Sequence, residues 1–342
     1  MIEIRRCRSD EIALVMAFID RHWQKGHALA ASRALMDWQH GADDGAYDYL
    51  IAIRDGQLLG VLGYIATRRF DPQLADRNVI WLALWKVLDN CGVAGLGLRM
   101  LTALNRIEPH VAIAVNGINR AHPPMYRALR YRVAELQRFF VVNPDQPRLM
   151  IQTAPGHALP APRGSGSEFV EMTASSLEAL PPARIASGAT PAKSPRYFLH
   201  RFLRHPFYRY RVFLARGKQH QPALFAMRVA QHDDARALRI VDFAGDPAAI
   251  AYCGEALAKV MNEVRAEYAD FWQLGLPEQH FEAAGFARLD LDGPLIVPNY
   301  FEPFLASNGR MPCAIRANDP ATAVICRADG DQDRPNRLPE VA

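Results

Sequence analysis

The chain has 342 residues and a formal net charge of +4 at pH 7, with 40 Lys and Arg against 36 Asp and Glu. Half of the residues are hydrophobic and 22% are charged, a composition that indicates a globular protein and excludes a disordered chain or a fibre. No apolar run approaches the roughly 20 residues that span a bilayer, so we expect no membrane span. The basic excess is small and scattered, and lysine is scarce, so the sequence does not indicate nucleic-acid binding.

The cysteine pattern bears on the cellular compartment. The five cysteines are odd in number and never spaced as C-x-x-C: Cys7, Cys91, Cys253, Cys313 and Cys326. This pattern argues against a disulfide framework and a structural zinc site, so we expect no metal. The N-terminus has no long apolar segment of the secretory type, and we expect a cytoplasmic protein.

The first 150 residues alternate between strand and helix patterns. The predicted strands are residues 2–7, 47–54, 58–67, 79–88, 111–116 and 139–143. The predicted helices are residues 12–19, 28–38, 96–107 and 123–129. Asp55-Gly56 between the second and third strands is a strong hairpin signal. Together these patterns predict an α/β domain that closes with the strand at 139–143.

Composition shifts divide the chain. Residues 153–166 read TAPGHALPAPRGSG, without a helix or strand period, and predict a linker. The polar stretch after Asn308 predicts an extended, solvated tail. The expected domains are therefore residues 1–150 and 168–308, with a linker at 151–167 and a tail at 309–342.

The second half repeats short motifs of the first in the same order. Residues 47–64 have a counterpart in 208–227, residues 85–89 in 238–242, and residues 125–131 in 280–286. Each match alone would be chance, but their common order predicts two copies of one fold in tandem. The copies differ after the second motif, because only the first copy continues from Asp89 into a glycine-rich segment.

That glycine-rich segment, residues 92–97, reads GVAGLG and lies between a predicted strand and a predicted helix. Glycines allow main-chain N–H groups to converge on an anion, and a helix N-terminus adds a favourable dipole. A Walker A loop is excluded because no Lys-Ser/Thr follows Gly97, and the position after four strands disfavours a dinucleotide-binding fold. The loop alone does not separate a phosphate site from a simple strand end.

With the following strand, Asn119 and the segment Tyr126-x-x-Leu129-x-Tyr131, the loop resembles the acyl-CoA-binding core of the GNAT (GCN5-related N-acetyltransferase) superfamily. The chain departs from the family pattern at Gly92, where Gln or Arg is usual, and at residues 130–131, where Gly-Phe is usual. The second half keeps Gly285-Phe286 but lacks the loop and has Phe281 in place of the tyrosine. The resemblance implies two GNAT-like mixed-sheet α/β domains in tandem, the second degenerate in the cofactor loop.

The resemblance also implies a donor, acetyl-CoA or another acyl-CoA, and the residues that bind it. These are Trp85, Lys86 and Val87 on the strand, Gly92, Val93, Ala94, Gly95, Leu96, Gly97 and Leu98 at the loop, and Asn119. Tyr126 matches the tyrosine that protonates the leaving CoA thiolate, and packing of the short helix is its alternative role.

An ammonium acceptor must lose a proton before it attacks the thioester. Asp89, which follows the strand, and His205 are the candidate bases, with His110 and His122 as further options. His205 lies in an aromatic and basic cluster whose guanidiniums and rings suit a nucleotide or sugar-phosphate ligand, or simply pack a helix end on a sheet. The candidate substrate-binding residues in that cluster are Arg201, Arg204, Tyr208 and Arg209.

The tail, residues 329–336, reads DGDQDRPN and is dense in acids. An EF-hand loop is excluded because its sixth position is Arg334 instead of glycine. A solvated tail is expected; the alternative is that it folds over the acceptor pocket and its carboxylates bind an ammonium.

The whole arrangement resembles acyltransferases of bacterial surface-polysaccharide synthesis (O-antigen, lipopolysaccharide). This implies N-acylation of a nucleotide-linked amino sugar. A tandem GNAT enzyme acting on a peptide or other small amine, and a non-catalytic acyl-CoA-binding protein, remain alternatives. The oligomeric state is left open.

Overall fold

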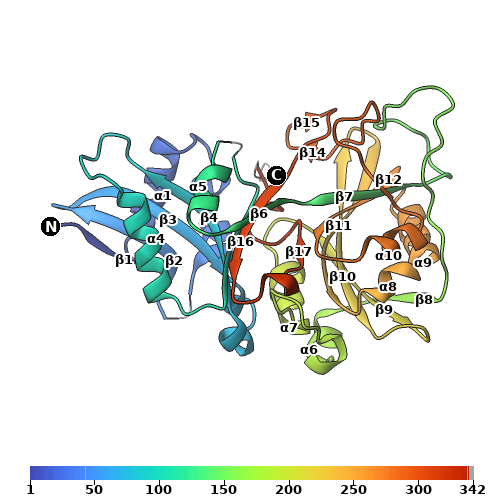
Figure 1. The fold of residues 1–342 in the computed structure, drawn as a ribbon, viewed down its shortest axis with the longest axis horizontal. Coiled ribbons are helices and arrows are strands. Elements are labelled where there is room, and N and C mark those ends of the chain that lie inside the picture. The colour runs from blue at the N-terminus through green and yellow to red at the C-terminus, as the bar shows by residue number, and fades with distance from the viewer. Residues whose placement is uncertain (43, 120, 337, 339–342) are drawn as a thin grey trace.

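A computed structural model describes residues 1–42, 44–119, 121–336 and 338. Within these residues the strands form two large mixed sheets that lie side by side (Figure 1). The first sheet has the order β1 (Glu3–Arg8), β2 (Ala46–Arg54), β3 (Gln57–Ala66), β4 (Val79–Val87), β5 (Ala112–Asn116), β16 (Pro312–Ala317), β6 (Arg132–Glu135).

The second sheet has the order β13 (Ala287–Arg288), β7 (Gln137–Val142), β12 (Tyr268–Leu274), β11 (Ala235–Gly245), β10 (Ala223–His232), β9 (Tyr210–Gly217), β8 (Ser167–Glu171). The short strand β17 (Ile325–Cys326) also pairs with β12, and β14 (Tyr300–Phe301) pairs with β15 (Phe304–Leu305). Each large sheet has one central parallel pair, β4 with β5 and β11 with β12. This shared plan confirms the expected repeat of one fold.

Helices cover both faces of the sheets. Those of the first half are α1 (Ile12–His22), α2 (Ala28–Ala31), α3 (Arg33–His40), α4 (Leu96–Ile107) and α5 (Pro123–Ala128). Those of the second half are α6 (Ala174–Ala179), α7 (Pro195–Phe198) with the π-turn η4 (Leu199–Leu203), α8 (Ala248–Ala251), α9 (Gly254–Glu263) and α10 (Glu278–Ala283). Single 3-10 turns are η1 (Thr67–Arg69), η2 (Pro72–Arg77), η3 (Pro182–Ile185) and η5 (Pro320–Thr322). The helix predicted at 28–38 is broken at Ser32, whose hydroxyl caps α3 by accepting from the amide of Leu35.

Most predicted strands are confirmed, but the closing strand of the first half is not where the sequence placed it. β7, expected at 139–143, crosses to the second sheet and pairs with β12 from Gln137↔Gln273 to Val142↔Tyr268 (Figure 1). Phe139 to Val142 are buried on both strand faces, so this segment is stable only inside a sheet that is covered on both sides.

The segment expected as an extended tail also differs from the prediction, because part of it is a strand of the first sheet. Residues 312–317 form β16, which returns to the first sheet and lies between β5 and β6 (Figure 1). Cys313, Ala314 and Ile315 are almost fully buried there. The segment predicted as the inter-domain linker, 151–167, connects β7 to β8, two strands of the same sheet. The two sheets therefore exchange strands, and a cut near residue 150 separates neither of them.

The hydrophobic core follows the same plan. One core lies between the sheets and contains Trp81 of β4 and Trp272 of β12 together with Phe198 and Phe202. A second lies between the first sheet and α4 and α5, with Leu82, Leu96 and Tyr126 among its members. The second core positions the glycine segment and α5 at one end of β4 and β5.

Candidate functional site

β4 and β5 part from each other halfway along β4. The parallel pairing runs only from Val79↔Ala112 to Leu82↔Val115, whereas β4 continues against β3 as far as Val87↔Gly60. Between Leu82 and Trp85 the register shifts, so that two residues of β4 oppose one of β3. Such a bulge bends a strand away from its neighbour. In the described part of the chain, residues 83–87 thus pair on one side only, and their other edge faces the wedge between the strands.

The glycine segment lies at the mouth of this wedge. Gly92 and Gly95 have φ of +66° and +67°, and a Cβ at either position would meet nothing within 4 Å. Gly95 is the N-cap of α4 and offers no side chain to the helix end. No hydrogen bond from the amides of residues 92–98 is found within the described part of the chain. Exposed, unpaired amides at a helix N-terminus can bind a phosphate group.

Neighbouring side chains hold this loop in place. A Cβ on Gly97 would lie 3.2 Å from Nε1 of Trp85, so the helix packs closely on the strand. Arg54 donates from Nη2 to the main-chain oxygen of Cys91 at 3.0 Å. Lys86 pairs with Asp89 at 3.0 Å, and the side chain of Asp89 is 87% exposed. The loop is therefore a preformed, cationic-edged cradle with one solvated carboxylate at its rim.

Tyr126 lies on α5, beside the wedge, and is 5% exposed. Its ring meets Tyr131 edge-on at 5.3 Å between centroids. Burial raises the pKa of Tyr126, so the phenol keeps its proton at neutral pH. The hydroxyl of Tyr131 is buried without a hydrogen-bond partner. Tyr126 is therefore a protonated phenol beside the wedge, and its role as the acid stays a prediction.

Two asparagines lie at and just beyond the end of β5, Asn116 and Asn119, and the sequence analysis singled out only Asn119. Asn119 is exposed, and its Oδ1 accepts from the amide of Ala121 at 3.0 Å. Asn116 is buried, and its Nδ2 donates to the main-chain oxygens of Cys326, Arg327 and Asp329 at 3.2, 3.4 and 3.1 Å. Asn116 was missed because its partners lie far away in the sequence.

The corresponding wedge of the second sheet is filled by the chain itself. β11 and β12 pair from Ala237↔Tyr268 to Ile240↔Phe271 and then separate. There, β17 pairs with Gln273 and Leu274 of β12, and the amide of Ala328 donates to the oxygen of Val241 in β11 at 2.8 Å. Phe281, at the place of Tyr126, stacks on Phe139 at 4.2 Å. Only the first sheet keeps both the wedge and the tyrosine.

The C-terminal segment, residues 326–334, is not the solvated tail that the sequence predicts. Asp329, Asp331 and Asp333 are 0%, 9% and 3% exposed. Asp329 and Asp242 both pair with the ammonium of Lys193, the former at 3.0 Å, and burial raises the pKa of Asp329 to about 6. Asp242, Cys326 and Asp329 have the spacing of a metal site, but Lys193 already supplies a cation there.

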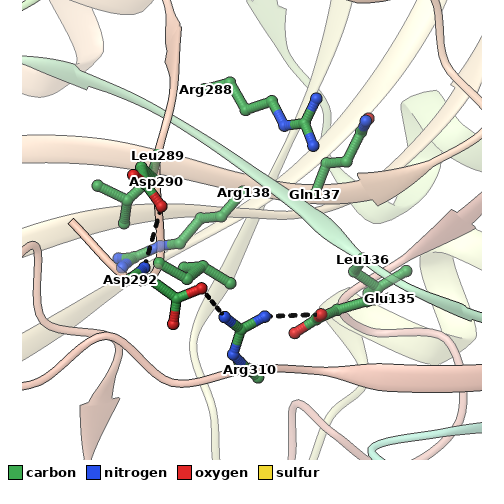
Figure 2. Close-up of a pocket in the computed structure, with 10 residues that line it drawn as sticks. Glu135, Leu136, Gln137, Arg138, Arg288, Leu289, Asp290, Asp292 and Arg310 are labelled. Carbon is green, nitrogen blue, oxygen red and sulfur yellow. Dashed lines mark hydrogen bonds and ion pairs between the residues drawn. The ribbon is translucent and has the colours of Figure 1, made fainter.

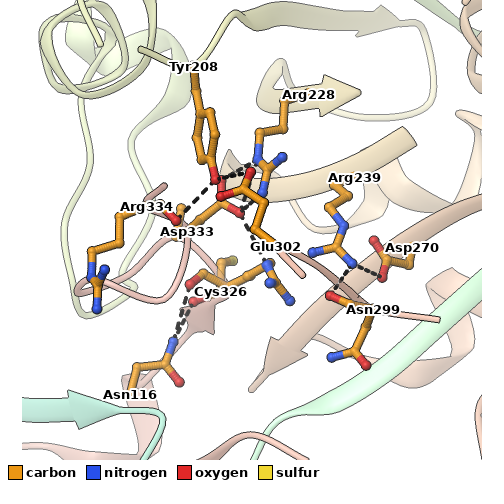
Figure 3. Close-up of polar contacts among 12 residues, drawn as sticks. Asn116, Tyr208, Arg228, Arg239, Asp270, Asn299, Glu302, Cys326, Asp333 and Arg334 are labelled. Carbon is orange, nitrogen blue, oxygen red and sulfur yellow. Dashed lines mark hydrogen bonds and ion pairs between the residues drawn. The ribbon is translucent and has the colours of Figure 1, made fainter. Parts of the chain in front are cut away.

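A cavity of about 350 Å³ lies between this segment, the second sheet and the loop that carries β14 and β15. Figure 3 shows polar contacts among residues of its wall, including Tyr208, Arg228 and Glu302. Five arginines line it: Arg228, Arg239, Arg310, Arg327 and Arg334. Glu302 and Asp331 are the carboxylates among the lining residues. Tyr208 places its ring 4.2 Å below the guanidinium of Arg228, and its hydroxyl donates to Glu302 at 2.9 Å. Asp331 and Gln332 join this cavity to the first sheet, because Gln332 packs directly on Gly117 after β5.

Of the four predicted substrate-binding residues, Tyr208 alone lines this cavity. Arg201 is 3% exposed and is used internally, because it donates to the oxygens of Ala328 and Gly330. Arg204 is exposed and pairs with Glu178 at 3.3 Å, and Arg209 is exposed. Arg201, Arg204 and Arg209 do not line the cavity, because neighbouring residues of a turn point in different directions, and their role in substrate binding stays a prediction.

His205 is a structural residue in this arrangement. Its Nδ1 accepts from the amides of Phe207 and Tyr208 at 3.1 and 2.9 Å. Burial, aided by the charge of Arg201, lowers its pKa to about 3, so the ring is neutral. Its ring centroid lies 4.3 Å from that of Trp38, and Nε2 is buried without a partner. The role of His205 as a base stays a prediction, and its Nδ1 already accepts from two main-chain amides.

A second cavity, of about 440 Å³, marks the crossing between the sheets (Figure 2). Figure 2 shows Arg310 between Glu135, at 3.0 Å, and Asp292. Glu135 ends β6 and Arg310 precedes β16, so the ion pair joins two neighbouring strands of the first sheet close to the point where the chain continues into β7. We assign this cavity a structural role.

Comparisons with known proteins bear on the fold. No protein-family model and no curated protein sequence matches the chain. A GCN5-related N-acetyltransferase from Anabaena variabilis ATCC 29413 superposes with a TM-score of 0.51 at 10% identity, over 93% of this chain and 73% of that one. One from Kribbella flavida superposes with 0.51 at 14% identity, over 93% and 71%. At such identities the likeness concerns the fold, and it confirms the GNAT-like tandem architecture.

Among the described residues, none of the helices has the length and apolar character needed to span a bilayer.

Proposed function

We propose that this chain, which has the fold of the GCN5-related N-acetyltransferases, is an acyl-CoA-dependent N-acyltransferase. The observation that carries the proposal is the asymmetry of its two wedges. Among the described residues, no strand pairs in the first wedge, which ends at the amides of residues 92–98 without main-chain partners, whereas β17 fills the second. The donor's diphosphate would bind those amides, and its pantetheine would lie along the free edge of residues 85–87. A protein that only kept the fold as a scaffold would not need this difference.

The chemistry follows from the groups at the wedge. A main-chain N–H on the free edge of β4 would bind the thioester oxygen and stabilise the oxyanion. The neutral amine attacks the carbonyl carbon, so that a C–N bond forms and the C–S bond breaks. Tyr126 would give its proton to the leaving thiolate, and a base would take the proton of the attacking amine.

Two carboxylates compete for the role of base. Asp89, the choice from the sequence, is exposed at the loop rim and paired with Lys86. Asp331 lies on the wall of the arginine-lined cavity, in the segment that Asn116 holds against β5. Because the acceptor must approach from a side other than the donor's loop, we favour Asp331.

For the acceptor we propose the amine of a nucleotide-linked amino sugar, handled in the cytoplasm during surface-polysaccharide synthesis. The support is the sequence resemblance together with the cavity, where arginines and aromatic rings suit phosphate and base. A peptide acceptor would need fewer cationic groups, and this is the reason to rank it second.

Calorimetric titration with acetyl-CoA and CoA tests the donor site. Gly95→Glu should abolish saturable binding, because it strains a residue at φ +67° and places a carboxylate where the diphosphate would lie. The matched control is Gly156→Glu, at φ +79° and equally unobstructed but on the loop between β7 and β8. Binding unaffected by Gly95→Glu, or no binding by the parent protein, would overturn the donor assignment.

Turnover with a panel of dTDP-, UDP- and GDP-linked amino sugars and several acyl-CoAs then tests the acceptor. Acylation of a nucleotide sugar but not of its free amino sugar supports the proposal. Tight acyl-CoA binding without turnover on any amine would favour the non-catalytic alternative.

A further inference from the structure

The arginine-lined cavity contains a buried charge imbalance. Four guanidiniums and two carboxylates form one cluster behind and along its wall: Arg138, Arg228, Arg239, Arg327, Asp270 and Asp333. Their side chains are at most 10% exposed. Each carboxylate is shared by two arginines, so these six ion-paired groups carry an excess of two positive charges; the other carboxylates of the cavity wall have partners of their own, Arg334 for Asp331 and Tyr208 for Glu302. Buried charges without partners are costly, which indicates that a ligand belongs there.

The sharing is unequal, and this locates the excess. Arg138 donates to Oδ2 of Asp270 from Nη2 at 2.7 Å and from Nε at 3.0 Å. The nearest guanidinium nitrogen of Arg239, Nη2, lies 3.8 Å from the same oxygen. Arg228 takes Asp333 through two of its nitrogens, at 2.8 to 3.1 Å, and Arg327 reaches the same carboxylate only through Nε at 3.2 Å. Arg239 and Arg327 are thus the two incompletely paired guanidiniums.

Both of these side chains carry buried N–H groups without hydrogen-bond partners, Nε of Arg239 and Nη1 of Arg327. They also repel each other. Burial, and next the charge of Arg327, lower the pKa of Arg239 to about 9. Both residues line the cavity, and the ring of Phe301 supports the guanidinium of Arg239 at 4.8 Å.

We propose that Arg239 and Arg327 together bind a phosphate group of the acceptor, as a site separate from the donor loop. The identification of that phosphate as part of the acceptor rests on the proposed function. A guanidinium binds phosphate oxygens through paired N–H donors, and a diphosphate diester or a phosphate monoester carries the two negative charges that the cluster lacks. A single carboxylate supplies only half of them, so the chemistry favours phosphate.

Inorganic pyrophosphate is the probe, titrated into the full-length protein by calorimetry. The parent protein should bind it saturably, and Arg327→Gln and Arg239→Gln should each weaken it about tenfold or more, the cost of losing a charge-assisted hydrogen bond. The control is Arg211→Gln, which removes an arginine paired with Glu171 and Glu263 outside the cavity and should leave the affinity unchanged. Arg239→Lys keeps the positive charge but loses the forked pair of N–H donors. Its affinity for pyrophosphate should lie between those of the parent protein and Arg239→Gln, and such a graded loss distinguishes weaker binding from loss of folding.

The donor loop also offers amides to phosphates, so the same titration is repeated in Gly95→Glu. Pyrophosphate binding that survives Gly95→Glu but falls with Arg327→Gln supports the acceptor site. Binding that Gly95→Glu removes and the arginine variants spare would overturn it. If acetyl-CoA binds and pyrophosphate does not, the phosphate site is refuted while the donor assignment stands. If acetyl-CoA does not bind while pyrophosphate binding still depends on Arg327, the phosphate site is supported and the proposed function is refuted.

Discussion

The side-chain Nδ2 of Asn116 lies 3.1 Å from the main-chain oxygen of Asp329, and this contact joins the end of β5 to the C-terminal segment. One amide group thereby fixes the segment that supplies Asp331 and Arg327 to the cavity. In the proposed function, the first sheet would bind the donor, while residues 327–336 would form the wall that faces the acceptor.

Asn116→Ala should therefore destabilise the protein and loosen that wall. Loss of a buried donor to three carbonyls leaves those oxygens poorly satisfied, at a cost of about 2 kcal/mol. Denaturant unfolding measures it, with Asn90→Ala, at an exposed position, as the control expected to change stability by less than about 0.5 kcal/mol. In kinetics, KM for the acceptor should rise and acetyl-CoA affinity should stay constant. An unchanged KM for the acceptor would contradict the claim that Asn116 positions the wall of the acceptor cavity.

Tyr126→Phe tests the general acid. Turnover should fall about 10²-fold or more, with CoA affinity retained, because only the proton donor is lost. Tyr131→Phe is the matched control, since its hydroxyl is buried without a partner and its removal should cost neither stability nor turnover. Equal turnover of Tyr126→Phe and the parent protein would leave Tyr126 as a packing residue.

The two candidate bases are distinguished by replacing each aspartate in turn with asparagine. Asp331→Asn should lower kcat about 10²-fold, whereas Asp89→Asn should change kcat by less than about twofold. The opposite pattern would restore Asp89 as the base. Thermal unfolding of both variants is the control. A melting temperature close to that of the parent protein would show that Asp331→Asn does not disturb the packing of the neighbouring Gln332 on Gly117 enough to destabilise the fold.

Lys193 should be among the residues whose loss is most destabilising. Lys193→Met leaves Asp242 and Asp329 buried together without a cation, which costs about 3–5 kcal/mol. Lys86→Met breaks the exposed pair with Asp89 and should cost less than about 1 kcal/mol. Urea unfolding compares the two variants, and equal losses would show that the Lys193 pair contributes no more than a surface ion pair.

Stability should fall as the pH drops from 7 to 5. His205, whose folded pKa is about 3, stays neutral in the folded state, while the unfolded chain takes up a proton near pH 6.5. Its contribution is complete above pH 6.5 and decreases toward pH 3, by about 2 kcal/mol between pH 7 and 5. His27 and His40, with folded pKa values of about 4 and 3, act in the same direction.

Two buried carboxylates oppose this trend. Burial raises the pKa of Asp48 and Asp329 to about 6, so as the pH falls each carboxylate takes up its proton in the folded state before it does in the unfolded chain. By pH 5 each therefore adds roughly 1 kcal/mol to the free energy of unfolding, against the loss caused by the histidines. His205→Asn, which keeps an acceptor for the two amides, should remove about 2 kcal/mol of the decrease. Urea unfolding at both pH values checks this, and an unchanged pH dependence would mean that His205 is not the neutral, buried group described above.

The sequence by itself determined the local elements and the glycine loop. The hairpin at Asp55-Gly56 forms as predicted, because both residues adopt positive φ and the pattern that specifies them is contiguous. Gly92 and Gly95 adopt the left-handed conformation that their spacing suggested. The repeat was visible because each copy conserves the order of its own strands and helices.

Tertiary structure alone decided which sheet each strand joins and which arginines face the cavity. β7 and β16 have hydrophobic patterns that fit either sheet, and their places follow from strand edges formed by residues far away in the chain. In the same way, Arg239 comes from β11 and Arg327 from the C-terminal segment, and neither has a neighbouring motif that marks it. Periodicity specifies which face of a strand is buried, but pairing between distant segments depends on the packing of the whole chain, which no local pattern records.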